Sequence, residues 1–347
     1  MRAAIAAAAA LALAWAPAAA ASTAQMATGY HPASSDCGKA DMCEYQYPAV
    51  TGAPGEMNDL TLTLADGTVT IRDAGAPLTA GPGCTQVDGN TVSCPSGPPR
   101  VSAGDLDDRV TDGTGVDATL RGDGGDDTLL GGAGHDLLHG GGGTDTLRGG
   151  PGSDSLSDDD TSGAANADVL DGGEGGDSVT YAARARGVTV DLRGRSPVGG
   201  ERNEGDSLPR VEHADGGAGD DVMRAGDAWS LFHGGGGHDR LFGGAAHDTL
   251  VGDDGRDRLA GGGGSDELSG RAGNDRLSGG AGRDWLFGRT GRDRLVGGPA
   301  RDHLAGGGGA DTLLARDGRA DKLIGGDGRD RARVDRRDLV RLVERLF

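Results

Sequence analysis

The chain has 347 residues, of which 69 are Gly and only 3% are aromatic, and its formal net charge is −20. This composition excludes a conventional core of large apolar side chains, so order has to come from repetition, metal ions or disulfides. The acidic balance argues against nucleic acid as a partner, and no apolar run after the N-terminal segment is long enough to span a membrane.

Residues 1–24 have the features of a secretory signal peptide. Arg2 gives the N-terminus a positive charge, an apolar run covers residues 3–16, and small residues allow cleavage after Ala21 or Ala24. A membrane anchor is the alternative interpretation, but the run is short for a span. We therefore expect a secreted, extracellular protein.

Four cysteines precede the repeats and are typical of an oxidising compartment. They are Cys37, Cys43, Cys84 and Cys94, and three pairings are possible. We favour Cys37–Cys43 together with Cys84–Cys94. The second pair would staple a hairpin that turns at residues 88–90.

A low-complexity segment, residues 25–54, is followed by a small β module at residues 55–100. Leu60, Leu62 and Leu64 alternate with Thr, and Asp66-Gly67 then supplies a turn signal. This pattern predicts a β-hairpin with one apolar face, pinned by the disulfide.

Gly-rich nonapeptides dominate the rest of the chain. A first block, residues 101–180, holds four clear nonapeptides from Gly122 to Ser157 and two weaker ones from Gly163 and Gly172. A non-repeat insert, residues 181–215, contains one strand-like run at 188–192.

The second block, residues 216–333, contains the longest array. Residues 216–314 form eleven nonapeptides without a phase slip: position one is Gly in all but Ala225, position six is Asp in all but Ser230, and position eight is always apolar. The last segment, residues 334–347, has apolar residues at helical spacing but could equally be a final strand. In either form we expect it to cap the repeats.

The unit Gly-Gly-x-Gly-x-Asp-x-Leu-x combines flexible backbone with an anionic oxygen. Glycine permits backbone angles that turn carbonyl groups inward, and Asp adds a carboxylate. Carbonyl and carboxylate oxygens without His or Cys favour Ca²⁺ over Zn²⁺ or Cu²⁺, while Mg²⁺ prefers to keep its waters. Multiple calcium ions are therefore the expected cofactors and partners.

The apo array should be largely disordered. Ordering nine residues costs roughly 1–2 kcal/mol each in backbone entropy, whereas burying one Leu returns only about 1.5–3 kcal/mol. Unneutralised Asp residues add repulsion. We expect the repeats to fold when calcium binds.

These nonapeptides resemble the RTX, or hemolysin-type, calcium-binding repeats over about 122–157, 163–180 and 216–330. The resemblance implies an all-β fold, a parallel β-roll or β-solenoid with two nonapeptides per turn and Ca²⁺ held between stacked loops. It also implies that the position-six carboxylates are metal ligands, with carbonyls of the first and third loop residues. These are Asp127, Asp136, Asp145, Asp154, Asp221, Asp239, Asp248, Asp257, Asp266, Asp275, Asp284, Asp293, Asp302 and Asp311.

Some units depart from the pattern. Ala246 and Ala300 replace the position-four Gly, and Arg271 and Arg289 replace the position-two Gly. A positive φ at such an Ala would cost about 1–2 kcal/mol. Ser230 removes one carboxylate.

An enzyme is the rival class, since such repeats often accompany hydrolases. The chain contains no His-Glu-x-x-His and no Gly-x-Ser-x-Gly; Gly205-Asp-Ser-Leu208 matches one esterase signature, but its expected Asp-x-x-His partner occurs only upstream, at Asp136 to His139. We therefore expect no enzyme and no catalytic residues, and instead a structural or cell-surface role. The protein or surface-polymer partner stays open, and binding of a polyanion by the many Arg of the second block is one hypothesis.

Overall fold

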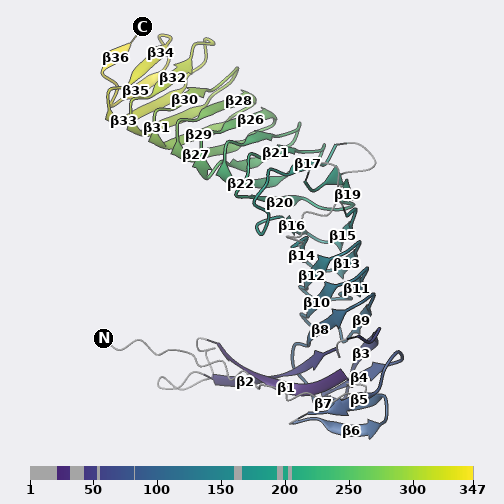
Figure 1. Ribbon diagram of the computed structural model, residues 1–347. Coiled ribbons are helices and arrows are strands. Elements are labelled where there is room, and N and C mark those ends of the chain that lie inside the picture. Colours follow the sequence, from purple (N-terminus) through teal and green to yellow (C-terminus); the bar gives the residue numbers. More distant parts are fainter. Residues whose placement is uncertain are drawn as a thin grey trace, which may run out of the picture.

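A computed structural model describes residues 22–31, 43–52, 55–81, 83–159, 166–193, 198–201 and 205–346, with side chains from Pro48 onward. All regular structure in these ranges is β-strand, so they contain no helix that could cross a membrane. The strands stack in one long column from a small N-terminal part to the C-terminus (Figure 1). The all-β prediction and the parallel β-solenoid are confirmed.

The N-terminal strands pair mainly antiparallel. They are β1 (Ser22–His31), β2 (Cys43–Thr51), β3 (Asp59–Ala65), β4 (Thr68–Asp73), β5 (Leu78–Ala80), β6 (Thr85–Asp88) and β7 (Thr91–Pro95). The predicted hairpin at Asp66-Gly67 is the β3–β4 pair, and β6 and β7 form a second hairpin that the Cys84–Cys94 disulfide joins, as predicted. Cys37 and residues 1–21 of the expected signal peptide lie outside the described residues.

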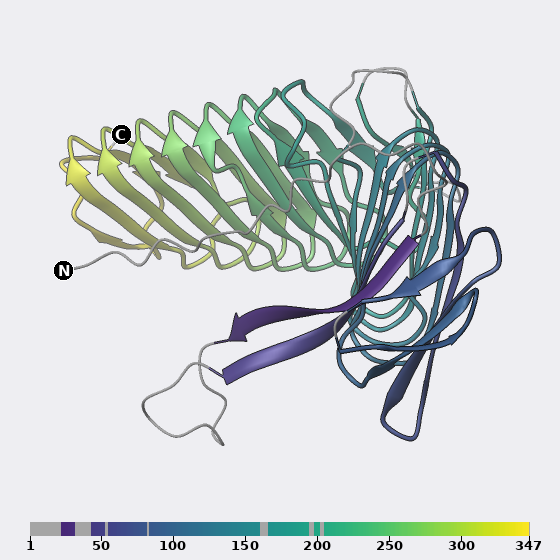
Figure 2. The ribbon, with the colours of Figure 1, turned by 60° about the horizontal axis from the view of Figure 1, so that its bottom comes forward.

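One strand, β2, lies within the range 25–54 expected as low complexity, and β1 begins at Ser22 in the expected signal peptide and continues into that range. The β1 and β2 strands pair antiparallel and extend as a ribbon away from the column (Figure 2). The far end of β2 pairs in parallel with the first strand of the repeat region, where Val50 lies beside Val101.

Two sheets form the walls of the solenoid, and their strands pair in parallel except at the short strand Val198–Gly199, which pairs antiparallel with both of its neighbours. Sheet A contains β8 (Arg100–Asp105), β10 (Thr119–Gly124), β12 (Leu137–Gly142), β14 (Ser155–Ser157), β16 (Ser178–Thr180), β20 (His213–Gly217), β22 (Leu231–Gly237), β24 (Thr249–Val251), β25 (Asp254–Gly255), β27 (Glu267–Gly273), β29 (Trp285–Gly291), β31 (His303–Gly309), β33 (Lys322–Gly328) and β35 (Leu339–Arg341).

Sheet B contains β9 (Arg109–Gly113), β11 (Thr128–Leu130), β13 (Thr146–Pro151), β15 (Val169–Glu174), β17 (Thr189–Asp191), β18 (Val198–Gly199), β19 (Asp206–Ser207), β21 (Val222–Arg224), β23 (Arg240–Phe242), β26 (Arg258–Gly263), β28 (Arg276–Ala281), β30 (Arg294–Val296), β32 (Thr312–Ala315), β34 (Arg331–Val334) and β36 (Arg345–Leu346).

The register shows that one turn consists of two nonapeptides. Leu250 pairs with Leu268 in sheet A, and Leu259 pairs with Leu277 in sheet B, so partners are separated by 18 residues. Successive nonapeptides therefore alternate between the sheets, and the second block forms a row of parallel strands (Figure 2).

The core is a narrow column of position-eight side chains. Every such residue from Met223 to Leu313 is at most 2% exposed. Because strands of three to seven residues point only this side chain inward, each nonapeptide contributes one large apolar group. The loops, and not the core, must therefore supply much of the order.

The solenoid is longer than the recognisable repeats. It begins at β8 and β9, before the first clear nonapeptide at Gly122. The insert joins the column too, since β17 pairs with β21 and β19 pairs with β15. The C-terminal segment forms strands, β35 and β36, which pair with β33 and β34.

Candidate metal-binding loops

Each position-six Asp lies at the end of a loop, directly before a strand. Successive turns stack these residues into two rows along the edges of the solenoid. Row A precedes the strands of sheet A and consists of Asp136, Asp154, Asp177, Asp248, Asp266, Asp284, Asp302 and Asp321. Row B precedes the strands of sheet B, except that Asp206 is the first residue of β19. It consists of Asp108, Asp127, Asp145, Asp168, Asp206, Asp221, Asp239, Asp257, Asp275, Asp293, Asp311 and Asp330. All fourteen predicted residues lie in these rows and are 0–3% exposed.

One carboxylate oxygen of each Asp holds the neighbouring turn. The main-chain N–H of Asp248 donates to Oδ1 of Asp266 at 2.9 Å, and that of Asp257 donates to Oδ1 of Asp275 at 2.9 Å. Ser230 also takes part as a donor, to Oδ1 of Asp248 at 2.8 Å. The carboxylates therefore connect turn to turn.

The other carboxylate oxygen, Oδ2, is buried and accepts no hydrogen bond in twelve of the fourteen predicted residues. These twelve are Asp127, Asp136, Asp145, Asp154, Asp239, Asp257, Asp266, Asp275, Asp284, Asp293, Asp302 and Asp311. In the other two, Oδ2 of Asp221 and Oδ2 of Asp248 accept from the N–H of Gly217 and Gly244. A buried acceptor without a partner is costly, so the rows lack a counter-charge at repeated positions.

Burial also opposes ionisation of the rows. Desolvation raises the pKa of Asp257 and Asp293 to about 7, although the main-chain hydrogen bond from the preceding turn acts to lower it. The same balance raises the pKa of Asp127, Asp136, Asp145, Asp239 and Asp302 to about 7. Neighbouring carboxylates of the rows add to the increase, for example Asp275 acting on Asp257.

Oxygen atoms converge on the position-one glycines. A Cβ added to Gly122 would lie 2.1 Å from Oδ2 of Asp127 and 2.6 Å from the carbonyl oxygen of Gly140, one turn along. The loop thus brings a carboxylate and a carbonyl oxygen together with no side chain between them. Such an all-oxygen donor set fits Ca²⁺.

The single exceptions at position one and at position six of the 216–314 array occur in the same unit. In the ten units with Gly at position one, an added Cβ would lie 2.1–2.7 Å from the position-six Oδ2. Ala225 brings such a Cβ, and its unit has Ser230 in place of Asp. In the first turn, Ala103 at position one and Asp108 at position six do occur together. A Cβ at position one therefore disfavours an Asp at position six but does not exclude it.

The glycine replacements have unequal consequences for the backbone. Ala300 has a φ of 143°, and Arg271 and Arg289 have φ of 70° and 79°, all in the region that favours glycine. The φ of Ala246 is not positive. The expected strain therefore applies to Ala300 and not to Ala246.

Six row members were not predicted as ligands. Asp168 and Asp177 are position six of the weaker repeats, and Asp321 and Asp330 follow a one-residue insertion at Ala320, which the loop absorbs. The sequence feature that could have identified these four residues is an Asp two residues before an apolar residue. Asp108 shares that signal, and Asp206 comes from the insert.

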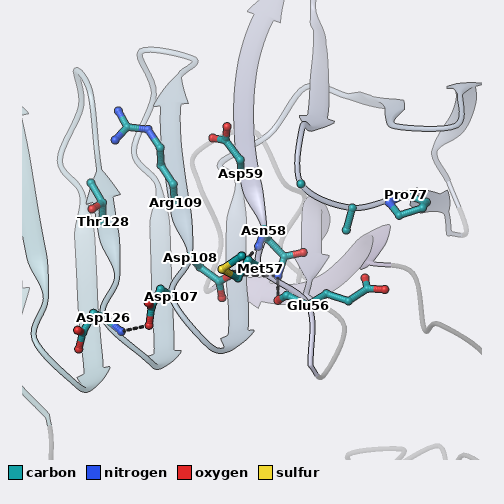
Figure 3. A pocket seen from close by; sticks show the side chains of 12 residues that line it. Glu56, Met57, Asn58, Asp59, Pro77, Asp107, Asp108, Arg109, Asp126 and Thr128 are labelled. Carbon is teal, nitrogen blue, oxygen red and sulfur yellow. Dashed lines mark hydrogen bonds between the residues drawn. The ribbon is translucent and has the colours of Figure 1, made fainter.

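Row B begins at a cavity between the N-terminal strands and the first turn. The cavity has a volume of about 650 Å³, and Glu56, Asp107 and Asp126 contribute to its lining. Figure 3 shows Asn58 beside Asp108, whose Oδ1 accepts the Asn58 main-chain N–H at 2.6 Å. The N-terminal part therefore supplies the first donor of row B.

At the insert, two members of row B belong to a buried cluster that also contains Asp158. Oxygens of Asp158, Asp168 and Asp206 lie within 4.8 Å of one another. Arg184 donates to both oxygens of Asp158, at 2.6 and 2.7 Å, and the Tyr181 hydroxyl donates to Asp206 at 3.0 Å. A guanidinium of the protein thus already supplies positive charge here.

The residues of the esterase-like signature are not brought together. Ser207 lies on β19 in sheet B, whereas His139 lies on β12 in sheet A. Asp136 and Asp206 are both members of the carboxylate rows.

A family model described as RTX calcium-binding nonapeptide repeat (4 copies) matches both blocks. The matches cover residues 121–156, 213–228, 225–259, 233–268, 251–286, 260–295 and 287–319. No curated protein matches the chain.

Proposed function

We propose that the chain is a secreted calcium-binding β-roll protein that folds on extracellular Ca²⁺, because parts of both blocks match the RTX calcium-binding nonapeptide repeat. The rows of buried Oδ2 atoms without a hydrogen-bond partner carry the proposal. Bound calcium would supply the positive charge that these oxygens lack.

The fourteen predicted Asp residues would hold the ions, together with carbonyl oxygens of the loops such as that of Gly140. The remaining row members extend the same chemistry toward both ends of the solenoid. Extracellular calcium sites commonly work at about 10⁻⁴–10⁻³ M, so folding would follow export.

Secretion is supported by two features of the chain. The first is the signal-like segment at residues 1–24, and the second is the Cys84–Cys94 disulfide, which is typical of oxidising compartments. We propose a structural or cell-surface role without catalysis, because Ser207 and His139 lie on different sheets.

The test is a far-UV circular dichroism titration of the chelated protein with Ca²⁺, with Mg²⁺ as the control ion. A cooperative gain of β signal with Ca²⁺ alone supports the proposal. A spectrum that is β-rich in chelator and unchanged by Ca²⁺ would indicate a metal-independent solenoid, and a coil spectrum throughout would contradict calcium-driven folding.

A further inference from the structure

The outward residue at position seven alternates in kind between the two sheets. In sheet B it is Arg in β23, β26, β28, β30, β34 and β36, with Thr312 as the single exception in this stretch. The arginine row consists of Arg240, Arg258, Arg276, Arg294, Arg331 and Arg345. In sheet A the same position holds Leu231, Thr249, Glu267, Trp285, His303 and Lys322.

The strand register places these arginines side by side. Arg258 pairs with Arg276, and Arg276 pairs with Arg294, one on each successive strand. Neighbouring strands lie about 4.7–4.9 Å apart, so Arg240, Arg258, Arg276 and Arg294 follow one another at about this spacing on four successive strands. Figure 1 shows the strands that carry it, β26, β28 and β30, next to one another.

The row has no partner of opposite charge within the described residues. All six side chains are exposed, and none of them forms an ion pair with another described residue. The other outward column of these strands holds Phe242, Ala260, Ser278, Val296, Leu314 and Arg333, so it offers no carboxylate either. Like charges directly opposite one another destabilise a sheet, so the row costs stability unless an external anion neutralises it.

A cavity of about 550 Å³ adjoins the C-terminal part of the row. Val296 and Leu314 give it apolar lining, and Arg316 and Arg333 add two guanidinium groups. Its one carboxylate, Asp317, already accepts the main-chain N–H groups of Ala300 and Arg319. The cavity therefore extends the cationic face and provides a hollow beside it.

We propose that a linear acidic polysaccharide binds along the arginine row. A row with one cation on each of the four successive strands β23, β26, β28 and β30 suits an extended chain of sugar units that carries regular carboxylate or sulfate groups, which guanidinium groups bind in a bidentate manner. Duplex nucleic acid fits less well, because the phosphates of each of its strands follow a helical path, with one phosphate per about 3.4 Å of the helix axis. Single-stranded nucleic acid needs stacking aromatics, and Phe242, the one aromatic of this face, is covered by Arg224 at 5.5 Å.

The inference goes beyond calcium binding, since the arginine row lies on a sheet face and not in the loops. It needs only the folded roll. All binding measurements are therefore made at one saturating Ca²⁺ concentration, and folding is followed separately by circular dichroism, so failure of calcium-driven folding and failure of polysaccharide binding give different results.

The experiment measures the Kd for chondroitin sulfate, with neutral dextran as the control polymer. The test variant is Arg240→Gln/Arg258→Gln/Arg276→Gln/Arg294→Gln. The matched variant removes the same charge from exposed position-five loop residues, as Arg256→Gln/Arg283→Gln/Arg292→Gln/Arg301→Gln. We expect at least about tenfold weaker binding for the test variant and no more than about twofold for the matched variant.

Equal losses in the two variants would overturn the proposal, because binding would then follow net charge alone. Absence of binding by the unaltered protein would overturn it as well, and so would tighter binding to duplex DNA or to vesicles containing phosphatidylserine. If the Gln variant does not fold, Lys at the same four positions keeps the charge but loses the bidentate geometry. The proposal then requires severalfold weaker binding by the Lys variant, and unchanged affinity would contradict it.

Discussion

The main-chain N–H of Asp239 donates to Oδ1 of Asp257, one turn further along the roll, at 2.9 Å. Oδ2 of the same Asp257 is buried without a partner. One oxygen of the carboxylate thus joins two turns, and the other remains for a cation. The two roles can be separated by substitution.

Asp257→Asn should preserve the link between turns, because an amide oxygen can accept the same N–H, but it removes the anionic ligand. We expect the Ca²⁺ midpoint of folding to rise, because a charged ligand is lost. Asp257→Ala loses the link between turns as well, so it should lower the stability of the Ca²⁺-loaded roll by about 1–3 kcal/mol more than Asp257→Asn. Circular dichroism titrations with Ca²⁺ and urea unfolding at saturating Ca²⁺ distinguish the two, and identical behaviour of the Asn and Ala variants would contradict the separation of roles.

Ala225→Gly/Ser230→Asp should restore a complete unit in the array. An added Cβ at position one would lie 2.1–2.7 Å from the position-six Oδ2 in the other ten units, so Ser230→Asp alone should gain little. The double variant should lower the Ca²⁺ midpoint and raise the number of ions bound. Isothermal titration calorimetry measures both quantities. A full gain from Ser230→Asp alone would show that Ala225 does not obstruct the carboxylate.

The metal-free roll should lose stability as the pH rises. Burial raises the pKa of Asp257 from the ordinary 3.8 to about 7, so the folded chain holds protons that the unfolded chain releases over this range. Stability in chelator is therefore greatest below about pH 4 and declines up to about pH 7. Calcium binding requires the ionised form, so calcium affinity should increase over the same range. Circular dichroism tests both trends, through the β signal in chelator and through Ca²⁺ titrations at several pH values. A β signal in chelator that rises with pH would contradict the first.

Ala300→Gly should stabilise the roll by about 1 kcal/mol, because Ala300 has a φ of 143° that glycine adopts more easily. Ala246→Gly is the matched control at the same position of another unit. Its φ is not positive, so glycine there should give no gain or a small loss. Thermal unfolding in Ca²⁺ compares the two, and equal effects would mean that φ is not the cause.

Arg184→Met should destabilise the region of the insert by about 3–5 kcal/mol, because it leaves the buried carboxylate of Asp158 without its guanidinium. Asp158→Asn/Arg184→Met removes both charges and should recover a large part of that loss. Hydrogen exchange of β15 to β21 localises the effect. A double variant as unstable as the single one would show that Arg184 acts through packing alone.

The nonapeptide spacing was sufficient to predict the apolar column. Each short strand points one side chain into the core, and Leu at every ninth residue supplies that side chain. It was also sufficient for most carboxylates of the rows, and the spacing of Cys84 and Cys94 predicted their disulfide. The ligand role of the fourteen Asp residues stays a prediction.

Other features depended on tertiary context. The first turn has an Asp two residues before Val110 but lacks most of the glycines of a repeat, so the nonapeptide pattern did not predict it. Residues 188–192 were strand-like, but their pairing with β21 follows from the neighbouring turns. From Arg240 to Arg294 the arginine row has a period of 18 residues, which became meaningful only once two units per turn were known.

The pairing of β2 with β8 and of β3 with β9 has a consequence for self-association. A stack of parallel strands can grow end to end into a filament if both of its terminal strands present free hydrogen-bonding groups. Here the N-terminal strands already pair with the outer edge of the first strand of each sheet. Val50 of β2 pairs with Val101 of β8, and Leu60 of β3 pairs with Val110 of β9. Head-to-tail polymerisation is therefore blocked at that end, and the roll has a defined length.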